Sequence, residues 1–77
     1  MKKVVIYSTP TCPFCQRAKK FLKDKGIEFQ DVDVSENEER IEEMIKKSGQ
    51  MGVPVLDIEG EIIVGFDVER IEKILGL

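Results

Sequence analysis

The 77-residue sequence contains no histidine, no tryptophan and only two cysteines. A closed structural zinc site needs four nitrogen or sulfur ligands, so two cysteines would require carboxylates or a second subunit to complete one. So few cysteines also exclude the disulfide framework typical of small secreted domains. The apolar run nearest the N-terminus, Val4–Tyr7, is too short for a signal peptide or a membrane span. We therefore expect a cytoplasmic protein of one domain, residues 1–77, with no membrane partner.

Charge is distributed unevenly along the chain. The formal net charge is −3, yet residues 1–25 contain seven Lys or Arg side chains and a single acidic one, Asp24. Each lysine of this stretch, taken alone, is typical of a solvated helix face, whereas together they favour anionic partners. The acidic total argues against a nucleic-acid partner.

The two cysteines lie three positions apart in Cys12-Pro13-Phe14-Cys15, shortly after a predicted buried strand, Val4–Tyr7. Pro13 suits the first position of a helix. Four apolar residues then follow the helical period on one face: Phe14, Ala18, Phe21 and Leu22. Cys12 is therefore expected at a helix N-terminus, where unpaired N–H groups and the helix dipole favour a thiolate.

This spacing favours redox catalysis over structural roles for the pair. A disulfide within the motif would close a very small loop and contribute little to stability. Zinc lacks ligands, as described above, and a metal or iron–sulfur cluster bridging two subunits through Cys12 is the remaining alternative. Two cysteines near a strand–helix–strand pattern are typical of thiol–disulfide exchange.

The remaining segments predict further helices and strands without linkers or repeats. Ser35 and Glu38 have the spacing of a capping box, and Glu59-Gly60 has that of a two-residue antiparallel hairpin. The glutamates at 36, 38, 39, 42 and 43 are expected on a solvated helix face. After the first helix we expect an edge strand over 27–34. A second helix follows, with Ile41, Met44 and Ile45 on its inward face, and ends at Gly49. Two strands over 53–58 and 61–64 come next, and a third helix extends from its cap, Asp67, to Gly76. The element order is βαβαββα.

Three motifs in this order resemble those of the glutaredoxins: Cys12-Pro13-Phe14-Cys15, Gly52-Val53-Pro54 and Gly65-Phe66-Asp67. The resemblance extends over nearly all of residues 4–75. It implies an α/β, thioredoxin-like fold, with a four-stranded mixed sheet flanked by three helices on both faces, its first two strands parallel. It also implies a cis peptide bond before Pro54 in a loop facing the cysteines, whereas the sequence alone indicates only a strand start with a trans bond.

The resemblance also implies roles for individual residues. Cys12 is the nucleophile and Cys15 resolves the mixed disulfide. Val53 offers its backbone to a bound peptide or to glutathione, and Asp67, with the N-terminus of its helix, holds the γ-glutamyl end. The implied substrate groove consists of Phe14, Gln50, Val53, Pro54, Gly65, Phe66 and Asp67.

The implied partners are glutathione and disulfide-containing proteins, with no tightly bound cofactor, no metal and a monomeric state. Many glutathione-using members carry a lysine shortly before the first cysteine, where this sequence has Ser8-Thr9-Pro10-Thr11, and Met51 occupies a position where arginine is frequent. A related group, the glutaredoxin-like hydrogen donors of ribonucleotide reductase, takes electrons from thioredoxin reductase. The sequence leaves both electron sources open.

Overall fold

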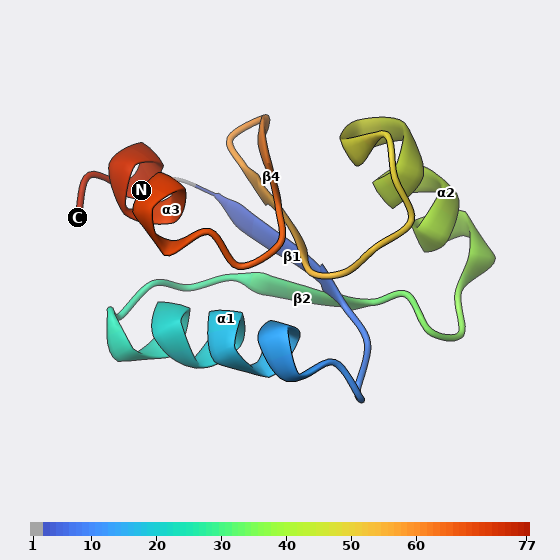
Figure 1. Ribbon diagram of the computed structural model, residues 1–77, viewed down its shortest axis with the longest axis horizontal. Helices are drawn as coiled ribbons and strands as arrows, with labels where there is room; N and C mark the ends of the chain where they lie inside the picture. The colour runs from blue at the N-terminus through green and yellow to red at the C-terminus, as the bar shows by residue number, and fades with distance from the viewer. Residues whose placement is uncertain (1–2) are drawn as a thin grey trace.

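The computed structural model describes residues 3–77 and builds them around a mixed sheet (Figure 1). The strands are β1 (Val4–Ser8), β2 (Gln30–Asp33), β3 (Val55–Ile58) and β4 (Glu61–Val64), in the spatial order β2-β1-β3-β4. β1 pairs with β2 in parallel and with β3 antiparallel, and β3 pairs antiparallel with β4. The predicted mixed sheet, its parallel first pair and the edge position of β2 are confirmed.

Helices cover both faces of this sheet, as expected. α1 (Pro13–Asp24) and α3 (Val68–Leu75) share one face, because Ala18, Leu22 and Ile71 join one core cluster with residues of the strands. α2 (Glu38–Ser48) lies on the other face, where Met44 packs in a second cluster. Among residues 3–77, no helix has the length and apolar character needed to cross a membrane.

Strand β1 supplies both clusters because successive side chains of a strand point to opposite faces. Val4 and Ile6 belong to the cluster under α1 and α3, whereas Tyr7 belongs to the cluster under α2. All three side chains are buried. Pairing with β2 on one side and β3 on the other places β1 inside the sheet, and its C-terminal end leads to the cysteines.

Two local predictions were wrong. α2 is capped by Asn37, whose side chain accepts a hydrogen bond from the Arg40 amide, and not by Ser35. The amide and hydroxyl of Ser35 instead donate to the Asp33 carboxylate, at 2.9 and 2.6 Å, which leaves no capping box. Phe14 was expected on the inward face of α1, but its position in the first turn leaves it 56% exposed.

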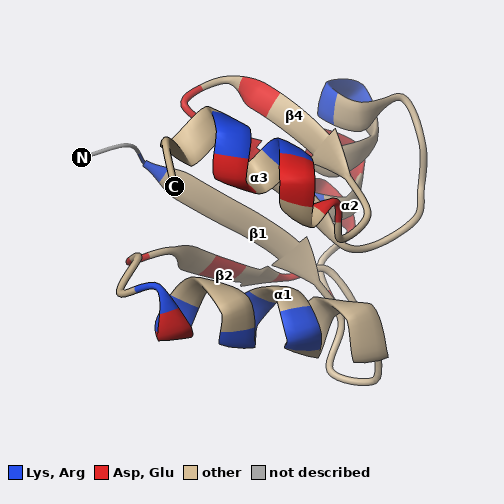
Figure 2. Ribbon diagram, turned by 60° about the vertical axis from the view of Figure 1, so that its left-hand side comes forward, with Lys and Arg blue, Asp and Glu red and all other residues tan. Residues whose placement is uncertain are grey.

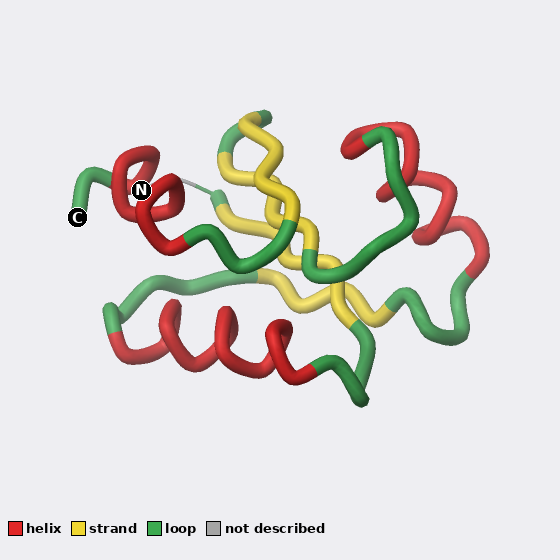
Figure 3. Tube along the Cα trace, in the orientation of Figure 1, coloured by secondary structure: helices red, strands yellow, loops and turns green. Residues whose placement is uncertain are grey.

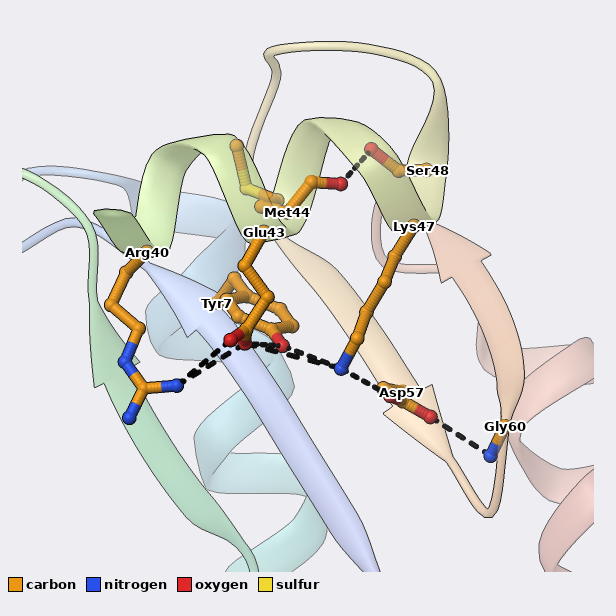
Figure 4. A network of polar contacts seen from close by, with 8 residues as sticks. All are labelled: Tyr7, Arg40, Glu43, Met44, Lys47, Ser48, Asp57 and Gly60. Carbon is orange, nitrogen blue, oxygen red and sulfur yellow. Dashed lines mark hydrogen bonds and ion pairs between the residues drawn. The ribbon is translucent and has the colours of Figure 1, made fainter. Parts of the chain in front are cut away.

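A polar network ties α2 to the sheet (Figure 4). The Tyr7 hydroxyl donates to Glu43 and accepts from Lys47 Nζ at 2.8 Å, and Lys47 also donates to Asp57 at 2.8 Å. The hydrogen bond from Tyr7 lowers the pKa of Glu43, and the hydrogen bonds to Asp57 and Tyr7 raise the pKa of Lys47. Burial would raise the pKa of Asp57, but the hydrogen bonds from Lys47 and the Gly60 amide keep it below its usual value. Glu43 is therefore not simply part of the solvated acidic face that its spacing predicted.

Candidate active site

The cysteine motif begins α1, as the position of Pro13 predicted. Cys12 is the N-cap residue and Pro13 follows within the first turn. The sulfur of Cys12 accepts a hydrogen bond from the Cys15 amide, with an N–Sγ distance of 3.1 Å. An amide donor and the positive end of a helix dipole both favour negative charge on this sulfur.

The two thiols are free and lie in different environments. Cys12 is partly exposed, whereas Cys15 is fully buried. Burial, and then its interaction with Cys12, raise the pKa of the Cys15 thiol to about 12, although a backbone hydrogen bond at Thr9 and the charge of Lys19 act in the opposite direction. A disulfide substrate can therefore reach Cys12, while Cys15 is the shielded partner.

The loop 49–54 carries a backbone group to the cysteines. The Val53–Pro54 peptide bond is cis, which confirms the expectation that came from the resemblance. The carbonyl oxygen of Val53 lies 4.0 Å from Cys12 Sγ. Pro54 is buried. The loop thus presents the main chain of Val53 beside the sulfur that a substrate would approach.

The loop 65–67 lies next to this backbone, and Figure 3 shows the two loops as neighbouring green segments. The Gly65 amide donates to the Pro54 carbonyl at 2.8 Å. Gly65 has a φ of +81°, a conformation that other residues rarely adopt. Asp67 caps α3 by accepting a hydrogen bond from the Arg70 amide at 3.2 Å, as its position predicted. The structure therefore brings Cys12, Val53, Pro54 and Gly65 together through direct contacts.

The remaining predicted residues make local contacts. Phe66 is half-buried and packs edge-on against Phe21 of α1, with ring centroids 5.9 Å apart. The guanidinium of Arg17 lies over the exposed Phe14 ring, 5.4 Å from its centroid. The side-chain amide of exposed Gln50 donates to Gly52 within its own loop at 3.5 Å. These contacts leave Phe14 and Gln50 on the surface, with no direct bond to the cysteines in the described structure.

Sequence reasoning missed one residue beside the site. Lys19 was expected to be solvated, but its ammonium lies 2.7 Å from the Asp31 carboxylate, with its side chain 16% exposed. Its spacing of four residues from Cys15 was the available signal, because residues four apart share a helix face. Nothing in the sequence identified Asp31 as its partner, since that contact depends on the place of β2 beside β1.

Two further observations concern what lies outside the cysteine motif. A cavity of about 480 Å³ opens at the other end of the molecule, between Val4, Ile27, Phe29 and Leu75, and includes no residue of the candidate site. Within residues 3–77, no group of three or more His, Cys, Asp or Glu side chains has an arrangement that could hold a metal ion.

Comparisons with known proteins give matches over most of the chain. The glutaredoxin family model matches residues 4–63. An uncharacterized glutaredoxin-like 8.6 kDa protein in the rubredoxin operon of Clostridium pasteurianum is 50% identical over 94% of this chain and 96% of that protein. Glutaredoxin 3 of Escherichia coli K12 is 45% identical, over 87% of this chain and 81% of its own length. The crystal structure of a glutaredoxin from Archaeoglobus fulgidus superposes with a TM-score of 0.86 and 32% identity, covering 97% of this chain and 87% of that one.

Proposed function

The chain belongs to the glutaredoxin family of thiol–disulfide oxidoreductases, and from this premise we propose that it reduces protein disulfides or glutathione mixed disulfides with electrons from glutathione. Cys12 is the nucleophile and Cys15 the resolving cysteine. The observation that carries this assignment is the difference between the thiols: Cys12 is partly exposed at the helix N-terminus, and Cys15 is buried behind it. Members of this family need no tightly bound cofactor.

The reaction has two exchange steps. The thiolate of Cys12 attacks one sulfur of the substrate disulfide, and the other sulfur leaves as a thiolate that takes up a proton. The thiol of Cys15 then loses its proton and attacks Cys12 Sγ, which releases the second substrate sulfur and leaves a Cys12–Cys15 disulfide. Two glutathione molecules reduce this disulfide and become glutathione disulfide.

The helix N-terminus assists more than the first attack. When glutathione attacks the glutathione sulfur of a mixed disulfide with Cys12, Cys12 is the leaving group, and a thiol that readily carries negative charge leaves faster. The amide of Cys15, 3.1 Å from Cys12 Sγ, is placed to stabilise that charge. The same contact therefore serves release as well as attack.

The proposed glutathione groove uses Phe14, Gln50, Val53, Pro54, Gly65, Phe66 and Asp67. The Val53 carbonyl beside Cys12 offers main-chain pairing to an extended tripeptide, and the N-terminus of α3 favours the carboxylates of an anionic ligand. Asp67 would accept the glutathione ammonium in addition to capping α3. The basic residues of α1, blue in Figure 2, favour the same anion.

The proposal also includes the protein's location, its substrates and its source of electrons. We expect a cytoplasmic monomer that acts on disulfide-containing proteins. The stretch Ser8–Thr11 has no lysine before Cys12, and this specific feature favours a second candidate electron source, thioredoxin reductase, as in hydrogen donors of ribonucleotide reductase.

A turnover assay distinguishes the two electron sources. The substrate is a glutathione mixed disulfide, assayed with glutathione plus glutathione reductase and separately with thioredoxin reductase. We expect activity with glutathione, its loss in Cys12→Ser, and retained activity in Cys15→Ser because glutathione can resolve the mixed disulfide. Asp67→Ala should also weaken turnover with glutathione. The effect should exceed what the loss of about 1 kcal/mol in folding stability, expected for a lost helix cap, can explain. If the protein is active with thioredoxin reductase and inactive with glutathione, the electron source is thioredoxin reductase and the proposal of glutathione is wrong.

A further inference from the structure

Lys19 is the cation placed closest in sequence to the buried resolving thiol on the same face of α1. It follows Cys15 by four residues, which puts both side chains on adjacent turns. Its side chain is only 16% exposed, unusual for a lysine, and its ammonium forms a 2.7 Å ion pair with Asp31 Oδ2. The charge is therefore held against the sheet and is not free to extend into solvent.

Two strands fix this ion pair. Asp31 belongs to β2, and its second carboxylate oxygen accepts a 2.8 Å hydrogen bond from the hydroxyl of Ser8, a buried residue at the end of β1. Ser8 and Asp33 face each other in the register of the parallel pair. The ammonium thus has a defined position relative to the end of β1, from which the chain continues to the cysteines (Figure 2 shows the acidic strand behind α1).

A positive charge near Cys15 would stabilise its thiolate, the form that attacks Cys12. Its thiol must lose a proton to attack the mixed disulfide, yet burial raises its pKa to about 12. The groups that act on it are the sulfur of Cys12, which raises the pKa, and the Thr9 backbone and Lys19, which lower it. On β2, Asp31 pairs with Lys19, and the pKa of Asp33 is lowered by its bonds to Ser35 and, more weakly, by Lys19.

We propose that Lys19 is a positioning residue for the second step of catalysis: its ammonium, anchored by Asp31 and Ser8, stabilises the thiolate of Cys15 as that sulfur attacks Cys12. This inference rests on the proposed role of Cys15. In the step, the Cys15 proton passes to solvent, the Cys15–Cys12 bond forms, and the bond from Cys12 to the substrate sulfur breaks. The substrate leaves as a thiolate that takes a proton from solvent, and Lys19 keeps its own proton throughout.

The first test measures Cys15 directly. In a Cys12→Ser background, serine keeps a good helix cap and leaves Cys15 as the single thiol. Adding Lys19→Met should slow alkylation of Cys15 by about three- to tenfold at a fixed pH and move its ionisation to higher pH. Lys19→Arg should restore much of the rate because it keeps the charge. Lys20→Met, an exposed neighbour on the same helix, is the matched control and should leave the rate unchanged.

The second test separates this inference from the proposed function. In rapid-mixing experiments with the protein that retains both cysteines, Lys19→Met should form the mixed disulfide at Cys12 at the normal rate and release the substrate through Cys15 more slowly. If Cys15→Ser itself leaves release unchanged without glutathione, the proposed role of Cys15 is wrong. If Cys15→Ser blocks release but Lys19→Met does not slow it, only the role of Lys19 is overturned.

A purely structural ion pair gives another result. Lys19→Met would then lower the urea midpoint without altering the alkylation rate of Cys15, and that outcome overturns the proposal. Should Lys19→Met fail to fold, Lys19→Gln keeps a polar group able to donate to Asp31 and carries the same expectation.

Discussion

Replacing Tyr7 by phenylalanine tests whether the polar network holds α2 on the sheet. The substitution keeps the buried ring within its cluster and removes only the hydroxyl that bonds to Glu43 and Lys47. Those two side chains come from α2, whereas Tyr7 lies in β1. The expected result is a less stable protein with an unchanged fold.

The size of the loss follows from the exposure of the partners. Hydrogen bonds to charged groups contribute about 1.5–3 kcal/mol each when the partner is shielded. The side chains of Lys47 and Glu43 are 36% and 37% exposed, so water replaces much of what the hydroxyl provides. We therefore expect a loss of about 1.5 kcal/mol in the free energy of unfolding, near the lower limit for one such bond. For a domain of this size that corresponds to a fall of about 6–12 °C in Tm.

Urea unfolding followed by far-ultraviolet circular dichroism is the appropriate assay, because the sequence has no tryptophan and the variant removes its single tyrosine. Glu43→Gln and the double variant complete a cycle, and their effects should be less than additive because both remove the same contact. A Tyr7→Phe protein as stable as the parent would show that the network contributes nothing to stability. Additive effects would refute the contact between Tyr7 and Glu43.

Two further predictions concern packing and acid. Met44→Ala should lower the free energy of unfolding by about 2–5 kcal/mol, because Met44 is fully buried between α2 and the sheet. Met51→Ala is the control and should leave the urea midpoint unchanged, because the side chain of Met51 is 70% exposed. Equal effects of the two substitutions would contradict the described packing. The folded pKa values of Glu43 and Asp57 lie below their usual range, so their stabilisation is complete above the unfolded values of about 4 and is lost as pH falls through the folded ones. The urea midpoint of the parent should therefore fall when the pH is lowered from neutral to acidic. The fall should be smaller in Lys47→Met, because those carboxylates have lost a partner.

Local signals in the sequence were sufficient for the elements that carry the chemistry. Pro13 at the first turn predicted the start of α1 and the capping position of Cys12. Glu59 and Gly60 both have positive φ, as a type I′ hairpin turn requires, and they join two antiparallel strands. The parallel pairing of the first two strands and the cis bond before Pro54 were expected from the family resemblance alone, because no local pattern determines either.

The errors arose where two local patterns competed or where tertiary position decided. Asn37 caps α2 in place of Ser35, because the hydroxyl of Ser35 donates to the carboxylate of Asp33, two residues earlier. Helical periodicity placed Phe14 inward, but periodicity does not indicate which turns of a helix lie over the sheet. Lys19 and Lys47 each pair with an aspartate of a strand, Asp31 in β2 and Asp57 in β3, so charge patterning along a single helix gave no information about these contacts.

The position of β1 has a consequence for how the chain reaches its folded state. β1 is the first strand along the chain but an inner strand of the sheet, and Val4 pairs with Ile58. A nascent chain that has grown as far as α2 contains β1 and β2 but lacks β3, so one side of an aliphatic strand has no hydrogen-bonding partner. Folding therefore waits for contacts of long sequence separation, which are slow to form. A fragment that stops before residue 55 would present this open edge to other chains and be prone to aggregation.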